Sequence, residues 1–348
     1  MRKLIAAALI IGLILYIIGL TPFGRERYQQ IWQSLGIPFF LTAQQHRKKA
    51  YDCKKKGHQW KALYHYGRAI SKNPYDAVLY YDRGTLYNDM GMYKNGLADL
   101  TKAIELNPKY KSAYHNRAYS KNNLHDFQGA IEDSNQAIAL EPKDAGAYTN
   151  RGISKENLRD YTGALEDYNV AISLRPNDSS TYTNRGNVKE DLGDYSGAIA
   201  DHTKAIELRP GNAGAYNNRA LAKDAVGDYP GALEDYAQAI ALSPRYAGAY
   251  NNRGYTKIHA GDYTGALQDL DYALYLRPNM ALAYNNKGIA WFFLKEYRTA
   301  LEQFNKAIEL DSTLQEAYRY RAQTRQALGD YNGFVEDEQM AKHLAEAE

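Results

Sequence analysis

Asparagine recurs along this chain at intervals of 34 residues, a spacing that brings side-chain amides into register in a repetitive structure. An amide both donates and accepts hydrogen bonds, so a row of amides can pair with a peptide backbone whatever the peptide's sequence. The row consists of Asn116, Asn150, Asn184, Asn218, Asn252 and Asn286. We therefore expect these side chains to contact an extended peptide. The alternative is that they bond neighbouring elements of the protein to one another.

Carboxylates and apolar residues recur at other offsets of the same period. The carboxylates are Glu156, Glu190, Asp191 and Asp224. The aromatic and aliphatic residues are Tyr255, Ile258, Phe292 and Phe293. On one surface, the acidic group would attract a basic segment, and an exposed apolar patch would mark an interaction site. The alternatives are a solvated acidic face and ordinary packing between repeats.

Arginine and aspartate recur in pairs that are 16 residues apart. The pairs include Arg151 with Asp167, Arg185 with Asp201, and Arg219 with Asp235. We predict a structural ion pair in each repeat, assisted by a lysine four residues after the arginine; a basic stripe that binds an anion is the alternative. Over residues 77–348 one repeat departs from this pattern, with Lys287 and Gln303 in place of the pair.

The sequence contains no set of residues typical of catalysis. The eight histidines are scattered, and Cys53, His58 and His65 do not match a recognisable metal-ligand spacing. The glycines fall at turn and packing positions instead of in a phosphate-binding loop. Because Cys53 is the single cysteine, an intrachain disulfide is excluded. We therefore expect a protein that is not an enzyme and that needs no cofactor or metal.

The elements that must position these residues follow a strict repeat. Proline occurs every 34 residues from Pro74 to Pro278, without an insertion. A fixed period of this length indicates stacked supersecondary units. With proline at position 32 of each repeat, glycine and aspartate at positions 15 and 16 predict a turn between two helices, the second capped by the aspartate. The repeats are 43–76, 77–110, 111–144, 145–178, 179–212, 213–246, 247–280, 281–314 and 315–348.

Most repeats also carry small residues at positions 8 and 20, and aromatic or other large residues at positions 4, 17 and 24. Over residues 43–348 this pattern resembles the tetratricopeptide repeat (TPR), a pair of antiparallel helices. The resemblance implies an all-α, right-handed superhelical solenoid of about nine repeats. It also implies protein binding in a concave groove lined by first-helix positions 2, 5, 6, 9, 12 and 13. The asparagines at position 6 resemble the asparagine ladder with which a member of the family binds extended peptides.

Not all repeats match the pattern equally well. Residues 43–76 read as a degenerate, basic first repeat, and residues 77–314 as seven regular repeats. Residues 315–348 read as a capping repeat, because Glu338 and Lys342 replace apolar residues on the face that no further repeat would cover.

The segment before the repeats begins with an apolar run that starts at Leu4 and contains neither charge nor proline. As a helix, residues 1–23 would span about 30 Å, the thickness of a bilayer core. We predict a single-pass transmembrane anchor over 1–23 and a linker over 24–42; a cleaved signal peptide is the alternative. The short basic flank Arg2–Lys3 favours the extracytoplasmic side for the repeats, whereas the basic cluster that begins at Arg47 favours the cytoplasmic side.

Charge is unevenly distributed, since residues 1–76 contain 13 Lys and Arg against 3 Asp and Glu. Our principal hypothesis is a membrane-tethered TPR scaffold that holds an extended segment of a partner protein in its groove. An exported adaptor released by signal cleavage is the alternative within the same class. The alternative of another class is binding of nucleic acid or another anionic surface by the basic N-terminal region.

Overall fold

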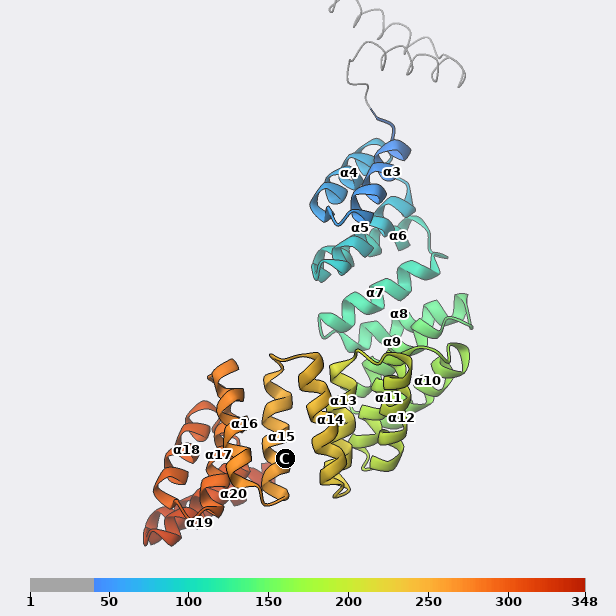
Figure 1. Ribbon diagram of the computed structural model, residues 1–348. Helices are drawn as coiled ribbons and strands as arrows, with labels where there is room; N and C mark the ends of the chain where they lie inside the picture. The colour runs from blue at the N-terminus through green and yellow to red at the C-terminus, as the bar shows by residue number, and fades with distance from the viewer. Residues whose placement is uncertain (1–40, 348) are drawn as a thin grey trace, which may run out of the picture. The chain divides into compact units, whose positions relative to one another are not determined.

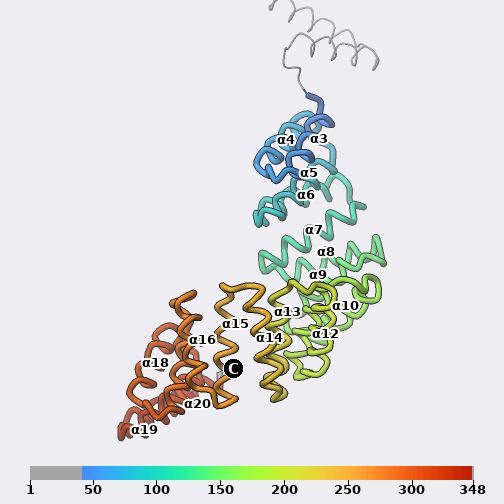
Figure 2. Tube along the Cα trace, in the orientation of Figure 1, coloured from blue at the N-terminus to red at the C-terminus, as the bar shows by residue number. Residues whose placement is uncertain are grey.

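The computed structural model describes residues 41–347, and these residues form eighteen α-helices without a β-strand (Figures 1 and 2). Consecutive helices pair as helix–turn–helix repeats, about nine in all over the described range. The predicted all-α repeat solenoid is therefore confirmed. By contact, the chain divides into two compact units, the first ending at Ser120 and the second beginning at Lys121.

The first unit is built from four complete helices and most of a fifth, in which the division falls. Its helices are α3 (Ala43–Lys55), α4 (Gln59–Lys72), α5 (Ala77–Asp89), α6 (Tyr93–Leu106) and α7 (Lys111–Asn123). Thr42 opens this unit as the N-cap of α3: its hydroxyl accepts from Gln45 N, and the Gln45 side chain accepts from Thr42 N. Two backbone donors at the helix start are satisfied in this way.

The second unit contains the remaining repeats. Its helices are α8 (Phe127–Leu140), α9 (Ala145–Asn157), α10 (Tyr161–Leu174), α11 (Ser179–Asp191), α12 (Tyr195–Leu208), α13 (Ala213–Ala225), α14 (Tyr229–Leu242), α15 (Ala247–His259), α16 (Tyr263–Leu276), α17 (Ala281–Phe293), α18 (Tyr297–Leu310), α19 (Gln315–Ala327) and α20 (Tyr331–Ala347). From α8 onward each helix packs against its neighbours in sequence, and first helices of consecutive repeats, such as α11 and α13, also touch.

The turn inside each repeat uses a residue with positive φ at position 15. Six repeats place glycine there with φ between 72° and 83°, and three place His125, Arg159 and Lys295 with φ between 61° and 65°. In six repeats the next residue is an aspartate that caps the second helix, as where Asp160 Oδ1 accepts from Gly163 N at 3.0 Å. The turn and cap predicted from the sequence are confirmed, and they end one helix and start the next within a few residues.

Small residues allow the two helices of a repeat to approach closely. At Gly152 of α9, an added Cβ would lie 2.6 Å from a ring carbon of Tyr168 on α10, so a larger residue would force that ring to shift. Tyr168 itself is fully buried, as are Tyr236 and Phe304 at the equivalent position of other repeats. The repeat spacing of small and large residues therefore sets how tightly each hairpin closes.

The predicted membrane localisation is wrong. We expected a single-pass membrane protein, with the repeats on the extracytoplasmic side. From residue 41 to residue 347, no helix is both long enough and apolar enough to span a bilayer. The longest, α20, has 17 residues, short of the roughly 20 apolar residues that a span requires. The proposed anchor over 1–23 and the linker up to residue 40 lie outside the described residues.

Candidate peptide-binding surface

An arginine and an aspartate join the two helices of most repeats. In the repeat of α9 and α10, Arg151 donates from Nε to Asp167 Oδ2 at 2.9 Å and from Nη2 to Oδ1 at 2.5 Å. Lys155 Nζ lies 2.9 Å from the same buried carboxylate, so two cations compensate its lost hydration. The same arginine–aspartate geometry joins Arg83 with Asp99, Arg185 with Asp201, Arg219 with Asp235, Arg253 with Asp269, and Arg321 with Asp337.

These arginines also connect consecutive repeats. Arg185 Nη1 donates to Asn169 Oδ1 at 2.6 Å, on the second helix of the preceding repeat. Its guanidinium carbon lies 5.6 Å from the ring centroid of Tyr182, one turn earlier on α11. Carboxylate, amide and ring thus hold one guanidinium at once. This arrangement favours a structural role for the arginines over a free basic stripe.

The repeat of α17 and α18 retains only the connection to the preceding repeat. Lys287 Nζ lies 2.6 Å from Asp271 Oδ1 on α16, and Gln303 stands in place of the buried aspartate. Trp291 stands in place of the assisting lysine, and its Nε1 is buried without a hydrogen-bond partner in the described part of the chain. Apolar packing around the fully buried Phe304 joins these two helices instead.

Asparagine side chains form a hydrogen-bonded row across the first helices of four consecutive repeats, α11, α13, α15 and α17. Each link runs from an Nδ2 donor to an Oδ1 acceptor, at 2.9 to 3.2 Å. The sequence pattern identified only every second member, because the partners stand at position 5 or 9 instead of position 6. In order from donor to acceptor, the row is Asn286, Asn251, Asn252, Asn217, Asn218 and Asn187.

The asparagines at position 6 therefore differ in what they can offer a ligand. Asn218, Asn252 and Asn286 use their donors within the row, and Asn116 Nδ2 donates to Ser112 O at 2.9 Å in the first unit. Asn150 and Asn286 are also buried. The Asn184 side chain makes no hydrogen bond to the rest of residues 41–347 and is partly exposed, so its amide is open to a ligand.

Three of the predicted carboxylates lie at position 12 of α9, α11 and α13, and two of them contact a buried side chain twelve residues further on. Tyr168 donates its hydroxyl to Glu156 Oε2 at 2.6 Å, and His202 Nε2 lies 3.0 Å from Glu190 Oε1. Asp224 Oδ2 lies 3.4 Å from His259 Nδ1. Sequence reasoning missed these supporting residues, although the twelve-residue offset of Tyr168 and His202 from their carboxylates could have identified two of them.

Burial and neighbouring charge both change the pKa of Glu156, the first of these carboxylates. Burial raises the pKa of Glu156, and the nearby charge of Asp191 on α11 raises the pKa further, against the lowering effect of the Tyr168 hydroxyl. Asp191 itself is exposed. None of Glu156, Glu190 and Asp224 has a lysine or arginine partner in the structure described, in contrast to the buried aspartates of the scaffold.

Aromatic rings gather at the ends of α15 and α17. The Phe293 ring, 43% exposed, stacks on Tyr263 at 5.3 Å, and Phe292 lies 5.8 Å from Tyr320 of α19. Tyr255 packs edge-on against His259 on the same side of α15. The prediction for Ile258 needs correction, because this side chain is 5% exposed and belongs to the core beneath the rings. Phe293 is exposed, and Phe292 and Tyr255 are partly buried.

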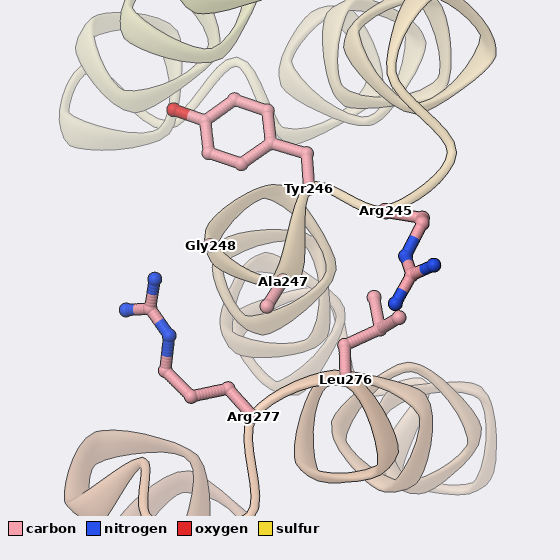
Figure 3. Close-up of a pocket in the computed structure, with 6 residues that line it drawn as sticks. All are labelled: Arg245, Tyr246, Ala247, Gly248, Leu276 and Arg277. Atoms are coloured by element: carbon pink, nitrogen blue, oxygen red, sulfur yellow. The ribbon is translucent and has the colours of Figure 1, made fainter.

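A separate pocket of about 270 Å³ lies at the start of α15. It is lined by Arg245, Tyr246, Gly248, Leu276 and Arg277, among others. Figure 3 shows the guanidinium groups of the two arginines on opposite sides of the helix, so they do not converge on one ligand position. Across residues 41–347, no group of three or more His, Cys, Asp or Glu is placed to hold a metal ion.

Comparisons with known proteins agree with the fold. A family model described as TPR repeat matches residues 225–257, and models described as tetratricopeptide repeat match 77–110, 115–179, 179–212 and 281–314. Together these matches span more than half of the chain. None of the curated proteins matches the sequence.

Solved structures show the same architecture at low sequence identity. A tetratricopeptide repeat protein from Parabacteroides merdae is 21% identical with a TM-score of 0.57, over 71% of this chain and 98% of that one. The Cut9–Hcn1 hetero-tetramer of the APC/C gives 17% identity and a TM-score of 0.60, over 84% of this chain and 57% of that one. At these identities the likeness concerns the fold alone.

Proposed function

Because the chain belongs to the tetratricopeptide repeat family, we propose that it is a protein-binding scaffold whose second unit holds an extended segment of a partner. The segment would carry basic residues against the position-12 carboxylates of α9, α11 and α13. An apolar side chain further along would rest on the rings of Phe292 and Phe293. This surface is a binding site without a catalytic step.

One observation carries the proposal: Glu156, Glu190 and Asp224 are held in place, yet no lysine or arginine in the described chain neutralises them. Most of the scaffold aspartates, such as Asp201, have two cationic partners. A carboxylate that is partly desolvated and lacks a cation gains more from a partner's ammonium or guanidinium group than a fully hydrated one. The position-12 carboxylates are thus suited to bind cations from outside.

The spacing of the helices predicts the spacing of the basic residues. The first helices α9, α11 and α13 are in sequential contact, and packed helix axes lie about 10 Å apart. An extended peptide advances about 3.3 Å per residue. Three peptide residues therefore span one repeat, and a segment with lysine or arginine at every third position would place one cation at each carboxylate.

Asn184 and the aromatic rings would add backbone and apolar contacts to these charges. Asn184 is on α11, between the Glu156 and Asp224 helices, and its free amide can pair with a peptide group. Phe293 is 43% exposed although its ring is already stacked on Tyr263. A rigid aromatic surface of this kind loses little side-chain entropy when it binds an apolar residue.

The test is a binding titration of the full-length chain with fluorescein-labelled peptides of identical composition. One peptide has lysine at every third position followed by leucine, and the other has the same residues with the lysines clustered. We expect the triple variant Glu156→Gln, Glu190→Gln, Asp224→Asn to lower the affinity for the spaced peptide at least about tenfold, which corresponds to about 1.4 kcal/mol of binding free energy. The Gln side chain at 156 still accepts from Tyr168, so that hydrogen bond is preserved.

The matched control removes the same charge from second helices of the same unit. Glu132, Glu166 and Glu234 are exposed on α8, α10 and α14, and their replacement with Gln should change the affinity less than about twofold. Equal weakening by both triple variants, or equal binding of the two peptides, would contradict the proposed site. Photoreactive residues at positions 184 and 292 should crosslink the bound spaced peptide.

A further inference from the structure

The first unit has its own pocket, of about 550 Å³, between α3, α4 and α5. A volume of this size is in the range of ligand sites in proteins. All its lining residues belong to the first unit, and α3 supplies most of them. The pocket is lined by Gln44, Arg47, Lys48, Tyr51, Lys54, Tyr66, Asp82 and Thr85.

The three cations of this pocket stand at positions where the scaffold needs none. Arg47, Lys48 and Lys54 occupy positions 5, 6 and 12 of the first repeat, whereas the ion pairs inside hairpins use positions 7, 11 and 23. The other repeats have no lysine or arginine at position 6 or 12, and only Arg319 at position 5. These cations therefore serve a purpose that the other repeats do not share.

Internal acids leave part of this positive charge uncompensated. Arg47 Nε donates to Asp82 Oδ2 at 2.6 Å, and Lys54 Nζ lies 2.7 Å from the half-exposed Asp89. Lys48 is exposed without an ion pair in the described residues. Over residues 43–72, nine Lys and Arg stand against one Asp. The surroundings thus add to the positive potential of the pocket.

The remaining lining groups suit a polypeptide. Asp82 Oδ1 makes no hydrogen bond to residues 41–347, and beside it Thr85 offers a hydroxyl oxygen. Both can accept from a peptide N–H, a donor that a sugar–phosphate backbone does not have. Tyr66 is buried, which raises its pKa to about 12, and Tyr51 is 63% exposed. The two rings form neutral walls on which the stems of side chains can pack.

From these observations we propose that the pocket binds an acidic segment of a partner protein, with Asp or Glu carboxylates on Lys48, Lys54 and the outer face of Arg47. The segment's backbone N–H groups would donate to Asp82. This site is independent of the basic-segment surface of the second unit, and it selects a ligand of the opposite charge. A chain with both sites recognises two differently charged segments.

The test measures binding of a fluorescein-labelled peptide of alternating Glu and Ser to the full-length chain. The double variant Lys48→Gln, Lys54→Gln removes two pocket cations. We expect it to lower the affinity for this peptide about tenfold. The matched control, Lys49→Gln with Lys55→Gln, removes two exposed cations of the same helix that do not line the pocket. It should change the affinity less than about twofold.

Three outcomes would overturn the proposal. Equal weakening by both double variants would mean non-specific attraction to the basic hairpin. Tighter binding of a single-stranded oligothymidine, with the same dependence on Lys48 and Lys54, would assign the pocket to nucleic acid. Loss of a dimer in the pocket variant, measured by light scattering without peptide, would assign it to a second copy of the chain. Binding of the lysine-spaced peptide to the second unit is measured in parallel, so failure at one site is distinguishable from failure at the other.

Discussion

Arg185 donates two parallel hydrogen bonds to Asp201, from Nε to Oδ2 at 2.8 Å and from Nη2 to Oδ1 at 2.6 Å. Asp201 is 4% exposed, and Lys189 Nζ lies 2.8 Å from the same carboxylate. The pair joins α11 to α12, and Arg185 extends the contact to Asn169 on α10. The Arg185–Asp201 pair and its contact with Asn169 thus connect three helices.

Replacing Asp201 with Asn should destabilise the second unit by about 3 kcal/mol, because it leaves Arg185 and Lys189 partly buried without a counter-charge. The measurement is urea unfolding followed by circular dichroism. Asp191→Asn removes an exposed carboxylate of α11, the helix that carries Arg185 and Lys189, and should leave the midpoint unchanged. An unaltered midpoint for Asp201→Asn would contradict the role assigned to the pair.

The turn residue Arg159 offers a stabilising change. Its φ of 63° is in the left-handed region where six other repeats place glycine, and a side chain there costs about 1 kcal/mol. Arg159→Gly should therefore raise the unfolding free energy by about that amount. The reverse change, Gly227→Ala, adds a Cβ that meets nothing within 4 Å and should lower the free energy by backbone strain alone. Thermal unfolding of both variants checks the sign.

The first hairpin should lose stability in mild acid. His46 Nδ1 lies 3.1 Å from His65 Nδ1, and burial lowers the pKa of both rings, with neighbouring positive charge lowering it further. Because the unfolded chain then binds protons more tightly, stability is full above about pH 6.5 and declines as the pH falls below it. Hydrogen exchange of α3 and α4 near pH 7.5 and pH 5.5 measures this decline.

A double variant provides the control for this pH dependence. His46→Tyr and His65→Asp introduce the residue types that the next repeat carries at the equivalent positions, Tyr80 and Asp99. Exchange in α3 and α4, corrected for intrinsic rates, should then be independent of pH over the same range. A decline that persists in this variant would have its source in other groups.

Two asparagines at position 6 should behave differently when truncated. Asn252→Ala removes a donor to Asn217 and an acceptor for Asn251, which should cost about 2 kcal/mol. Asn184→Ala breaks no hydrogen bond within residues 41–347 and should change stability by less than about 0.5 kcal/mol. Its effect should instead appear in the affinity for the lysine-spaced peptide. A large stability loss at Asn184 would mean that this amide has a structural partner.

The repeat pattern predicted the fold because each signal acts locally. Glycine at position 15, aspartate at 16 and proline at 32 define where helices start and stop, and small residues such as Gly152 define where they touch. The prediction of a membrane localisation rested on residues 1–23, which lie outside the described residues, and no helix of residues 41–347 could span a bilayer.

The candidate site was harder to predict because it depends on side-chain direction. Position 6 alone did not reveal that the Asn218 and Asn252 donors are used between repeats, since their partners stand at other positions. Apolar character alone did not separate Ile258, which is in the core, from Phe293, which is exposed. The support of Glu190 by His202 requires the distance across the hairpin.

The asparagine row has a consequence for how such a chain can change in length. Its links between repeats connect equivalent or nearly equivalent positions, so residues 213–246 could be deleted as a block and Asn252 would then stand opposite Asn187. A deletion of any other length would break the row and misplace the amides. Insertions and deletions are therefore tolerated in steps of one 34-residue module, as in a polymer whose monomers are interchangeable.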